Sequence, residues 1–338
     1  MGLIKLNPDS AVPKYLQIVE SIVAAVRSSE LSKGDKLPSL ASVARSCDVS
    51  INTVVKAYAI LKRRGLARTT FGQGFYLTTD SIETNINVFL LFDEINMFKE
   101  DLYMSFKEEL GQNARIDVFF HHFNPRVFKS LVVDAKDNYS HYVVMPVPGS
   151  AASSALAALP SESLLFLDRV WGHNERRFVA QDHQEGTFAA LSANADFVKA
   201  YSRLRVINPK AAYLDPFYEI ILKGAKSFGD ASGMEIVTES NPDFSKIERG
   251  DLYLTISERD LASFVLSARE KGLRLGKDVG LVAYNDTSVR ELMDVGIATI
   301  STDYKEMGRS AAKRILDPSL PSEFIPTRLK IRPSIMKN

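Results

Sequence analysis

The stretch GDKLPSLASVARSCDVSINTVVKAYAILKRRGLARTTFGQGFYL, residues 34–77, contains two helix-start signals that follow each other closely. Ser39 comes after a Leu-Pro pair and stands where a short helix over residues 40–46 needs an N-cap. Ser50 stands in the same way before a longer helix over about residues 51–64. The pattern therefore predicts two consecutive helices separated by a tight turn.

The residues after the second helix predict a β-hairpin. Gly65 stands where a helix commonly ends in the left-handed conformation. Residues 67–70 and 75–78 are expected to pair as strands across the glycine-containing tip 71–74. Before this stretch, an apolar stripe predicts one more helix that begins near residue 12; it consists of Leu16, Val19, Val23 and Val26. Helix, helix, turn, helix and hairpin make up a winged helix-turn-helix, which we assign to residues 1–79.

Charge is distributed unevenly along the chain. The 338 residues carry a net charge of only +1, with 42 basic and 41 acidic side chains. Residues 1–79 hold eleven lysines and arginines against five acids, so this segment is +6 and the rest is −5. A basic segment on an acidic body is expected where the segment alone faces a polyanion. From charge alone, chance variation between two surfaces is the alternative.

Composition disfavours several classes of protein. Apolar runs such as residues 88–92 are far shorter than the roughly 20 residues that cross a bilayer, so no membrane partner is expected. The first residues lack an apolar signal region, and we expect a cytoplasmic protein. Cys47 is the single cysteine and cannot form an internal disulfide. No metal site is expected, because His121 and His122 lack an acidic or cysteine partner at ligand spacing.

From residue 86 onward, short apolar runs alternate with amphipathic stretches of helix length. The polar, aperiodic residues 80–85 are expected to form a linker. Strands that are apolar throughout and separated by helices predict parallel sheets covered on both faces. The strands are expected at residues 87–92, 116–120, 141–145, 164–167, 204–207, 235–237, 252–256, 279–283 and 298–300. The helices are expected near residues 99–112, 125–138, 184–199, 215–231, 258–271 and 303–316.

Because this is more strands than one sheet usually contains, we predict two α/β subdomains within residues 86–338. The first is expected to take about residues 86–181 and 303–318, and the second about 182–300 and 319–332. Ligands of open α/β sheets bind at the carboxyl ends of the strands, and two such subdomains facing each other would form a cleft. The predicted fold class is α/β, with an N-terminal winged helix-turn-helix followed by this two-subdomain region.

The second helix of the pair is expected to enter the major groove of DNA. A recognition helix presents short polar side chains at its N-terminal end, and the preceding helix crosses the DNA backbone. The wing tip is expected in the adjacent minor groove, where missing Cβ atoms allow close approach. The expected DNA contacts are Ser39, Arg45, Ser50, Asn52, Thr53, Lys56, Gly72, Gln73 and Gly74. The alternative is a winged helix that contacts protein, with these groups merely solvated.

These residues resemble the DNA-binding domain of the GntR family. Residues 34–39 match the family's G-x-x-L-P-S, and residues 44–50 match A-x-x-x-x-V-S. Residues 61–66 match L-x-x-x-G-L, and residues 72–77 match the glycine-flanked wing. The resemblance is strong over residues 34–77 and implies a sequence-specific, operator-binding transcriptional regulator.

The chain departs from that family at two positions. Family members commonly carry a basic residue after the positions of Ser39 and Ser50, and here Leu40 and Ile51 stand there instead. Base readout is therefore expected to depend on Asn52, Thr53, Lys56 and the wing. The operator need not resemble the commonest one of the family.

Short strings spread thinly over about residues 85–332 resemble the LacI/GalR effector domain, itself similar to periplasmic sugar-binding proteins. NVFLLFD at residues 87–93 is similar to its first strand, and LFLDR at 165–169 to a strand that ends in Asp-Arg. GLVAYND at 280–286 is similar to its V-V-G-[FY]-D-D segment, and MGRSAA at 307–312 to M-G-x-x-A. The resemblance implies that this region senses a small molecule. It places ligand contacts at Asp168, Glu258, Asn285 and Tyr304.

Polar and aromatic side chains follow several predicted strands, where a ligand would bind. Carboxylates and amides can take sugar hydroxyls, and aromatic rings can stack on the sugar. The expected ligand residues are Phe92, Asp93, Asn96, Phe98, Asp168, Glu219, Glu258, Asn285 and Tyr304. For any one of them, a strand-end cap or a loop hydrogen bond is the alternative. The LacI/GalR family usually has Asp where Glu258 and Asn285 stand.

The resemblance also bears on the ligand. The family often places an arginine near the helix that opens at residue 215, and its absence here disfavours a carboxylate or phosphate ligand. We therefore expect an uncharged monosaccharide, and resemblance to regulators of this hybrid architecture suggests a pentose or a deoxyhexose such as fucose. The sequence predicts a homodimeric repressor that leaves its operator when sugar binds, although an activating version is equally compatible.

An enzyme is the alternative from a different class. A winged helix can be fused to a catalytic α/β body, and GntR-type heads are sometimes joined to an aminotransferase-like one. The sequence shows no phosphate-binding loop of the G-x-x-x-x-G-K-[ST] kind, no G-x-S-x-G elbow and no G-x-G-x-x-G after a strand. No catalytic residue and no cofactor is therefore expected.

Overall fold

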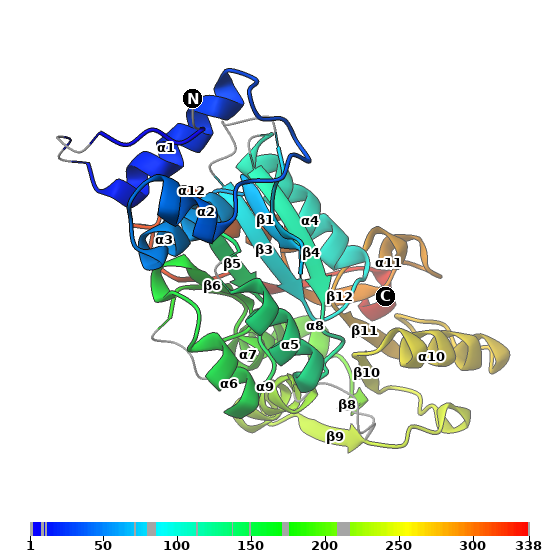
Figure 1. Cartoon of the computed structure of the whole chain (residues 1–338). Helices are drawn as coiled ribbons and strands as arrows, with labels where there is room; N and C mark the ends of the chain where they lie inside the picture. The colour runs from blue at the N-terminus through cyan, green and yellow to red at the C-terminus, as the bar shows by residue number, and fades with distance from the viewer. Residues whose placement is uncertain are drawn as a thin grey trace. The chain divides into compact units, whose positions relative to one another are not determined.

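The computed structural model describes residues 3–7, 10, 12–70, 72–79, 86–112, 114–136, 138–148, 150–170, 176–207 and 217–336, and Figure 1 labels its elements. The predicted linker, the hairpin-tip residue Phe71 and the predicted helix start at residue 215 lie outside the described residues. The chain forms two compact units. Unit 1 consists of Met1–Glu94, Phe106–Phe178 and Ala311–Pro321; unit 2 consists of Ile95–Ser105, Val179–Ser310 and Ser322–Asn338.

Unit 1 begins with the predicted winged helix-turn-helix, which we call the head. It consists of α1 (Lys14–Arg27), α2 (Leu40–Ser46), α3 (Ile51–Arg63), β1 (Ala67–Thr70) and β2 (Gly74–Leu77). Both predicted N-caps are confirmed, since Ser39 Oγ accepts from the Ser42 amide at 3.1 Å and Ser50 Oγ from the Thr53 amide at 3.2 Å. Gly65 has a φ of +66°, which places it in the left-handed conformation expected after a helix.

The core of the head confirms one predicted helix face and corrects another. The predicted core face of α3 is buried and consists of Val54, Ala57, Tyr58 and Leu61. On α1 the predicted stripe is too narrow, because Ile18 and Ile22 are also fully buried whereas Leu16 is only half-buried. The helix is covered on one side over a wide arc, which a single row of apolar residues does not reveal.

The rest of unit 1 is built on four parallel strands in the order β6-β5-β3-β4. Their bounds are β3 (Ile86–Phe92), β4 (Ala114–Phe120), β5 (His141–Val144) and β6 (Leu164–Asp168). The helices between them are α5 (Pro125–Ala135) and α6 (Ser150–Leu156), while α4 (Met97–Leu110) leads from unit 2 into unit 1. β3 is buried along almost its whole length, as expected of a central parallel strand.

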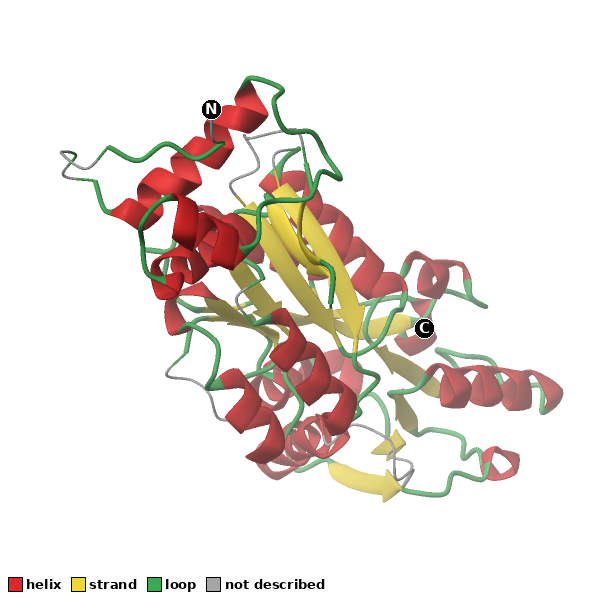
Figure 2. Cartoon of the chain, in the orientation of Figure 1, coloured by secondary structure: helices red, strands yellow, loops and turns green. Residues whose placement is uncertain are grey.

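Unit 2 contains a six-stranded sheet of order β14-β12-β11-β10-β8-β9. Its strands are β8 (Arg203–Ile207), β9 (Glu235–Glu239), β10 (Leu252–Thr255), β11 (Gly280–Tyr284), β12 (Ala298–Thr302) and β14 (Thr327–Lys330). Its helices are α7 (His183–Ser192), α8 (Ala195–Val198), α9 (Phe217–Ser232), α10 (Glu258–Glu270) and α11 (Ser288–Leu292), and α12 (Tyr304–Leu316) leads back to unit 1. Figure 2 shows strands flanked by helices throughout. All pairings are parallel except that of β12 with β14.

The structure corrects some predicted elements. The prediction of a single helix over residues 184–199 is wrong, because the first helix stops after Ser192 and a short second helix starts at Ala195. Between them Asn194 has a non-helical φ of −125°, and its side chain donates to the carbonyl of Ala190. Three short strands were not predicted, namely β14, β7 (Phe178–Ala180) and β13 (Glu323–Phe324). With two to four residues each, they are too short for an alternating pattern to stand out.

The predicted fold class is confirmed. The chain is α/β with parallel sheets and carries an N-terminal winged helix-turn-helix. In each unit the parallel strands end at a common edge, and the predicted ligand residues Asp168 and Asn285 lie at or directly after the ends of β6 and β11.

Candidate DNA-binding and effector sites

The first turn of α3 presents the predicted base-reading residues, but several of their polar atoms already have partners. Ser50 Oγ caps the helix and lies 2.9 Å from Thr53 Oγ1. The Lys56 ammonium lies 4.0 Å from the centre of the Tyr15 ring, a cation–π contact worth about 0.5–1 kcal/mol at an exposed site. Asn52 is exposed. The Asn52 amide thus lies at the surface, whereas Ser50 and Lys56 have contacts within the head.

The remaining predicted contacts lie on α2 and the wing. Ser39 caps α2, and Arg45 is exposed with its Nε 3.3 Å from the carbonyl of Ala41 in the same helix. Gly72 and Gln73 are exposed, and Gly74 is half-buried; the predicted wing contacts are Gly72, Gln73 and Gly74. The two glycines have φ values of +70° and +108°, which side chains rarely adopt. Glycine therefore gives the wing both its tight turn and its slender tip.

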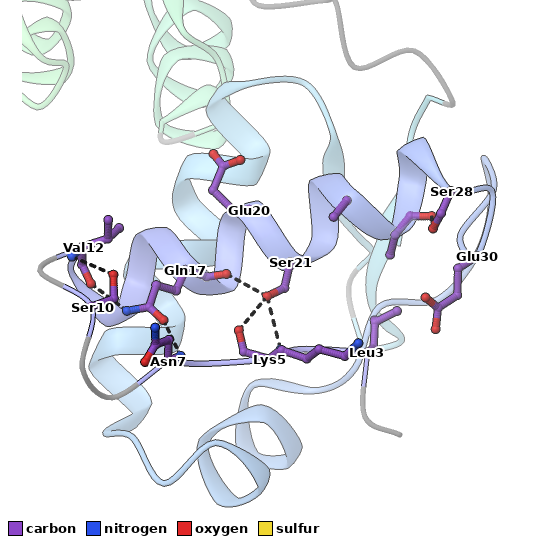
Figure 3. Close-up of a pocket in the computed structure, with 12 residues that line it drawn as sticks. Leu3, Lys5, Asn7, Ser10, Val12, Gln17, Glu20, Ser21, Ser28 and Glu30 are labelled. Carbon is purple, nitrogen blue, oxygen red and sulfur yellow. Dashed lines mark hydrogen bonds between the residues drawn. The ribbon is translucent and has the colours of Figure 1, made fainter.

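An N-terminal segment, Leu3 to Asn7, lies along α1 and is hydrogen-bonded to it (Figure 3). Ser21 Oγ bonds both the amide and the carbonyl of Lys5, at 3.2 and 3.1 Å, and Gln17 accepts from the amide of Asn7 at 2.7 Å. A groove of about 730 Å³ lies along this seam. These bonds hold α1 in place, and α1 in turn supports Lys56 through Tyr15.

Unit 1 contains a buried ionic cluster at the carboxyl ends of β3 and β6. Arg169 Nη2 lies 2.9 Å from Asp93 Oδ2, and Arg169 Nε lies 3.4 Å from Asp168 Oδ2. All three side chains are at most 8% exposed. The guanidinium also lies 5.6 Å from the centre of the Phe123 ring. Two of the predicted ligand carboxylates thus share one arginine.

Unit 2 contains a chain of side-chain hydrogen bonds at the carboxyl ends of β11 and β12. Tyr304 Oη donates to Asn285 Oδ1 at 3.2 Å and accepts from Gln181 Nε2 at 2.9 Å. Thr302 Oγ1 donates to Gln181 Oε1 at 3.0 Å and lies 2.8 Å from Thr327 Oγ1. Asn285 is half-buried and the other four are buried. We call these five residues the amide–hydroxyl cluster.

An aromatic pair adjoins this cluster. The rings of Phe98 and Tyr304 have centres 4.7 Å apart and are inclined by 38°. Both line a pocket of about 640 Å³ in unit 2, together with Thr302 and Asp286. Burial raises the pKa of the Asp286 carboxyl, but hydrogen bonds and charge from Arg332 outweigh burial and hold the pKa below its usual value. The pocket therefore combines hydroxyls, aromatic faces and an ion-paired carboxylate with the basic side chains of Lys305, Arg328 and Lys330.

Asp168 and Asn285 share an unusual backbone conformation. Their φ values are +66° and +63°, in the left-handed region that non-glycine residues seldom occupy. Aspartate and asparagine tolerate this region better than most residues, yet the conformation costs about 1–3 kcal/mol each. Such strain persists where surrounding structure over-determines it and is concentrated at binding sites. Five other non-glycine residues among those described also have a positive φ, namely Ser29, Asp48, His122, Phe123 and Asp294. The conformation therefore supports the strand ends at β6 and β11 as candidate effector sites only together with the polar clusters there.

Comparison with known proteins identifies both parts of the chain. Residues 14–77 match the bacterial regulatory proteins of the gntR family, and residues 242–335 match a periplasmic binding protein-like domain. The HTH-type transcriptional repressor YtrA of Bacillus subtilis strain 168 is 34% identical over 100 residues, which are 30% of this chain and 73% of that protein. The chain belongs to the GntR family. It is a transcriptional regulator with a DNA-binding helix-turn-helix and a periplasmic-binding-protein-like domain.

The larger part of this GntR-family chain has the fold of LacI-family regulators. A LacI-family transcriptional regulator from Silicibacter pomeroyi is 16% identical, with a TM-score of 0.61 over 74% of this chain and 98% of that one. The Lac repressor dimer bound to operator and the anti-inducer ONPF is 15% identical, with a TM-score of 0.59 over 74% and 94%. At these identities the likeness concerns the fold.

Other predicted ligand residues of this regulator have local partners. Asn96 Oδ1 accepts from the Lys99 amide at 3.1 Å in the first turn of α4, and Phe92 is fully buried. Glu258 forms a two-pronged ion pair with Arg290, at 2.7 and 2.8 Å. Glu219 is exposed in the first turn of α9. The structure brings together Phe98, Asn285 and Tyr304 in unit 2, and Asp93 with Asp168 in unit 1.

Sequence reasoning missed several residues of these sites. Gln181, Thr302 and Thr327 complete the amide–hydroxyl cluster, and Arg169 pairs with both carboxylates of unit 1. Gln181 follows β7, a strand too short to predict, so no pattern pointed to it. Arg169 carried a signal, because it is the residue directly after Asp168 in a recognised string.

Within the part of the chain that the structure describes, no group of three or more histidine, cysteine, aspartate or glutamate side chains is placed to hold a metal ion. His121 is instead buried, and its Nε2 lies 3.0 Å from the carbonyl oxygen of Met145. No helix among the described residues is long and apolar enough to cross a membrane.

Proposed function

We propose that this regulator is a repressor whose effector is an uncharged monosaccharide held by the amide–hydroxyl cluster of unit 2. The cluster is the observation that carries the proposal, because amides and hydroxyls both donate and accept, as sugar hydroxyls require. Phe98 beside Tyr304 supplies an aromatic face for the apolar side of a sugar ring. A pentose or a deoxyhexose such as fucose fits this chemistry.

The pairing of three buried arginines with carboxylates supports an uncharged ligand. Arg169 is paired with two carboxylates, Arg290 with Glu258, and Arg332 with Asp286 at 2.8 and 3.0 Å. An anionic ligand that paired with one of these three arginines would have to displace its carboxylate. A neutral ligand needs no such exchange, because it can bind through hydrogen bonds to hydroxyls and amides alone.

Repression and dimerisation are further parts of the proposal. The relative YtrA is named a repressor, and the Lac repressor of the same fold is a dimer that binds operator and a small molecule. We infer that this chain is a homodimer that binds operator DNA through α3 and the wing. Sugar binding would favour a second conformation with a coupling of about 1–3 kcal/mol and so release the DNA.

Loss of sugar binding is expected when the amide–hydroxyl cluster is altered. A monosaccharide that saturates wild type a hundredfold above its Kd should stabilise it by about 2.7 kcal/mol, read as a rise in Tm. Asn285→Gly keeps a residue that accepts a φ of +63°, and Tyr304→Phe keeps the ring contact with Phe98. Each variant should lose most of the rise while its affinity for operator without sugar stays unchanged.

The measurement is a thermal-melt screen against a panel of neutral monosaccharides, followed by operator titration with the best one. Glu270→Gln is the control, since Glu270 is exposed in unit 2 and belongs to no candidate site. If no neutral sugar raises the Tm of wild type, or if both variants keep the full rise, the proposed site is wrong. If an acidic sugar or a phosphate acts instead, the neutral-ligand proposal fails.

Exposed apolar residues in unit 2 fit a subunit interface. Leu292 is 83% exposed, and Val289 and Val295 nearby are also exposed. Single exposed residues are ordinary, but three within one short segment suggest that a second copy covers them. Leu292→Asp is expected to weaken a dimer at least tenfold in sedimentation equilibrium, whereas Leu316→Asp, at an exposed position of unit 1, should not. A monomeric wild type would contradict the homodimer.

A further inference from the structure

The recognition helix α3 exposes two apolar side chains that no described neighbour buries. Ile51 is 53% exposed and Val55 is 45% exposed. They are four residues apart and therefore adjacent on the helix surface. Asn52, also exposed, lies beside them on the same arc. Neither apolar residue belongs to the core of the head, to which this helix contributes Val54, Ala57, Tyr58 and Leu61.

The polar groups around this pair are held by contacts within the head. Ser50 caps α3 and is bonded to Thr53, and the Lys56 ammonium lies against Tyr15. The surface that the first two turns offer to a partner therefore combines one amide and two branched apolar side chains with the exposed Ser50 and Lys56. The head that carries it has a net charge of +6, which makes DNA its complementary partner.

We propose that α3 reads a run of A·T pairs, with Ile51 and Val55 against thymine 5-methyl groups and Asn52 on a neighbouring adenine. The inference rests on the proposed operator binding through α3. In the major groove thymine is the base that presents a methyl group, and apolar side chains recognise it by contact. An asparagine amide matches the N6 and N7 edge of adenine with two hydrogen bonds.

The same surface discriminates against G·C pairs. Guanine is most often read by arginine or lysine, which donate to O6 and N7. Ile51 and Val55 have no donor to offer there, so a guanine opposite them would lose its hydration without gaining a partner. The two β-branched side chains are also stiff in a helix, so they hold their methyl groups in place at little entropic cost.

The test uses duplexes that the full-length chain selects from a random DNA pool. The enriched half-site should contain at least two thymines whose replacement by deoxyuridine, which lacks only the methyl group, weakens binding about fourfold each, as for one buried methyl. Ile51→Ala should bind the thymine duplex about tenfold more weakly. At the thymine that Ile51 contacts, the deoxyuridine exchange should have no further effect on this variant, and Val55→Ala should behave likewise at the other thymine.

Val12→Ala is the matched control, because Val12 is a comparably exposed apolar residue of the head outside α3. It should keep wild-type affinity and full sensitivity to deoxyuridine. The proposal would be overturned if the enriched half-sites contained no thymine, or if the wild type bound thymine and deoxyuridine duplexes equally well. It would also be overturned if Ile51→Ala and Val55→Ala lost as much affinity on deoxyuridine exchange as the wild type does. A change in oligomeric state of Ile51→Ala by sedimentation would instead assign the pair to a protein contact. If no duplex is enriched at all, operator binding itself fails, which separates the two outcomes.

Discussion

Replacing Arg169 with methionine should lower the free energy of unfolding by about 3–5 kcal/mol. In the folded protein Arg169 is the ion-pair partner of Asp93 and Asp168, all of them almost completely buried. Methionine fills much of the same space but leaves two carboxylates without this counter-charge. Their desolvation then lacks compensation, and the folded state loses stability. Urea unfolding monitored by circular dichroism measures the change. The variant's denaturation midpoint should fall while the dependence of the unfolding free energy on urea concentration stays the same.

Two further variants make that result specific. Arg115→Met removes an exposed pair with Asp117, whose side chains are 43% and 30% exposed, and should cost less than about 1 kcal/mol. Adding Asp93→Asn to Arg169→Met should restore part of the lost stability, because one buried charge is removed. Equal losses for Arg169→Met and Arg115→Met would show that the cluster is effectively solvated.

Operator affinity should fall about a thousandfold when the salt concentration rises from 50 to 200 mM. Each phosphate that the head neutralises releases condensed counterions, so the logarithm of the affinity declines linearly with the logarithm of the salt concentration. The head carries the charge for this, with eleven basic and five acidic residues in residues 1–79. Fluorescence anisotropy with a labelled operator duplex at several salt concentrations gives the slope.

A single charge removed from the head should reduce this slope. Arg45→Gln is expected to reduce the magnitude of the slope of log affinity against log salt concentration by about one for each DNA-binding head. It should weaken binding to all DNA sequences alike. Lys271→Gln, at an exposed position that follows α10 in unit 2, should leave the slope unchanged. A flat salt response of the wild type would contradict a phosphate-contacting head.

Local signals were sufficient for the head. Ser39 and Ser50 each cap a helix, and Gly65 ends one with a left-handed φ. Each of these effects involves only residues within about one helical turn, so it can be read from the neighbouring sequence. The longer parallel strands of both units were also predictable, since a buried parallel strand is apolar along its length, whereas the short β7, β13 and β14 were not. The break at Asn194 was not, because the interrupted stretch keeps residues that a helix accepts.

The candidate effector sites were predictable only as single residues. Asp168 and Asn285 were identifiable because each follows an apolar strand, but their partners come from distant parts of the chain. Arg169 lies 76 residues from Asp93, and Gln181 lies 123 residues from Tyr304. Sequence periodicity describes which face of an element is buried; it contains no information about which strand ends meet.

The winged helix-turn-helix, its charge and the α/β character of the remainder thus follow from the amino-acid sequence, because caps, glycines and apolar periods act locally. Tertiary structure alone decided that Asp93 and Asp168 share Arg169, that Asn285 joins Tyr304 and Gln181, and that Ile51 and Val55 remain uncovered. Those outcomes depend on strand order and on packing between elements far apart in the chain. Burial and pairing of polar groups are properties of the assembled fold, and so the chemistry of the sites appears only there.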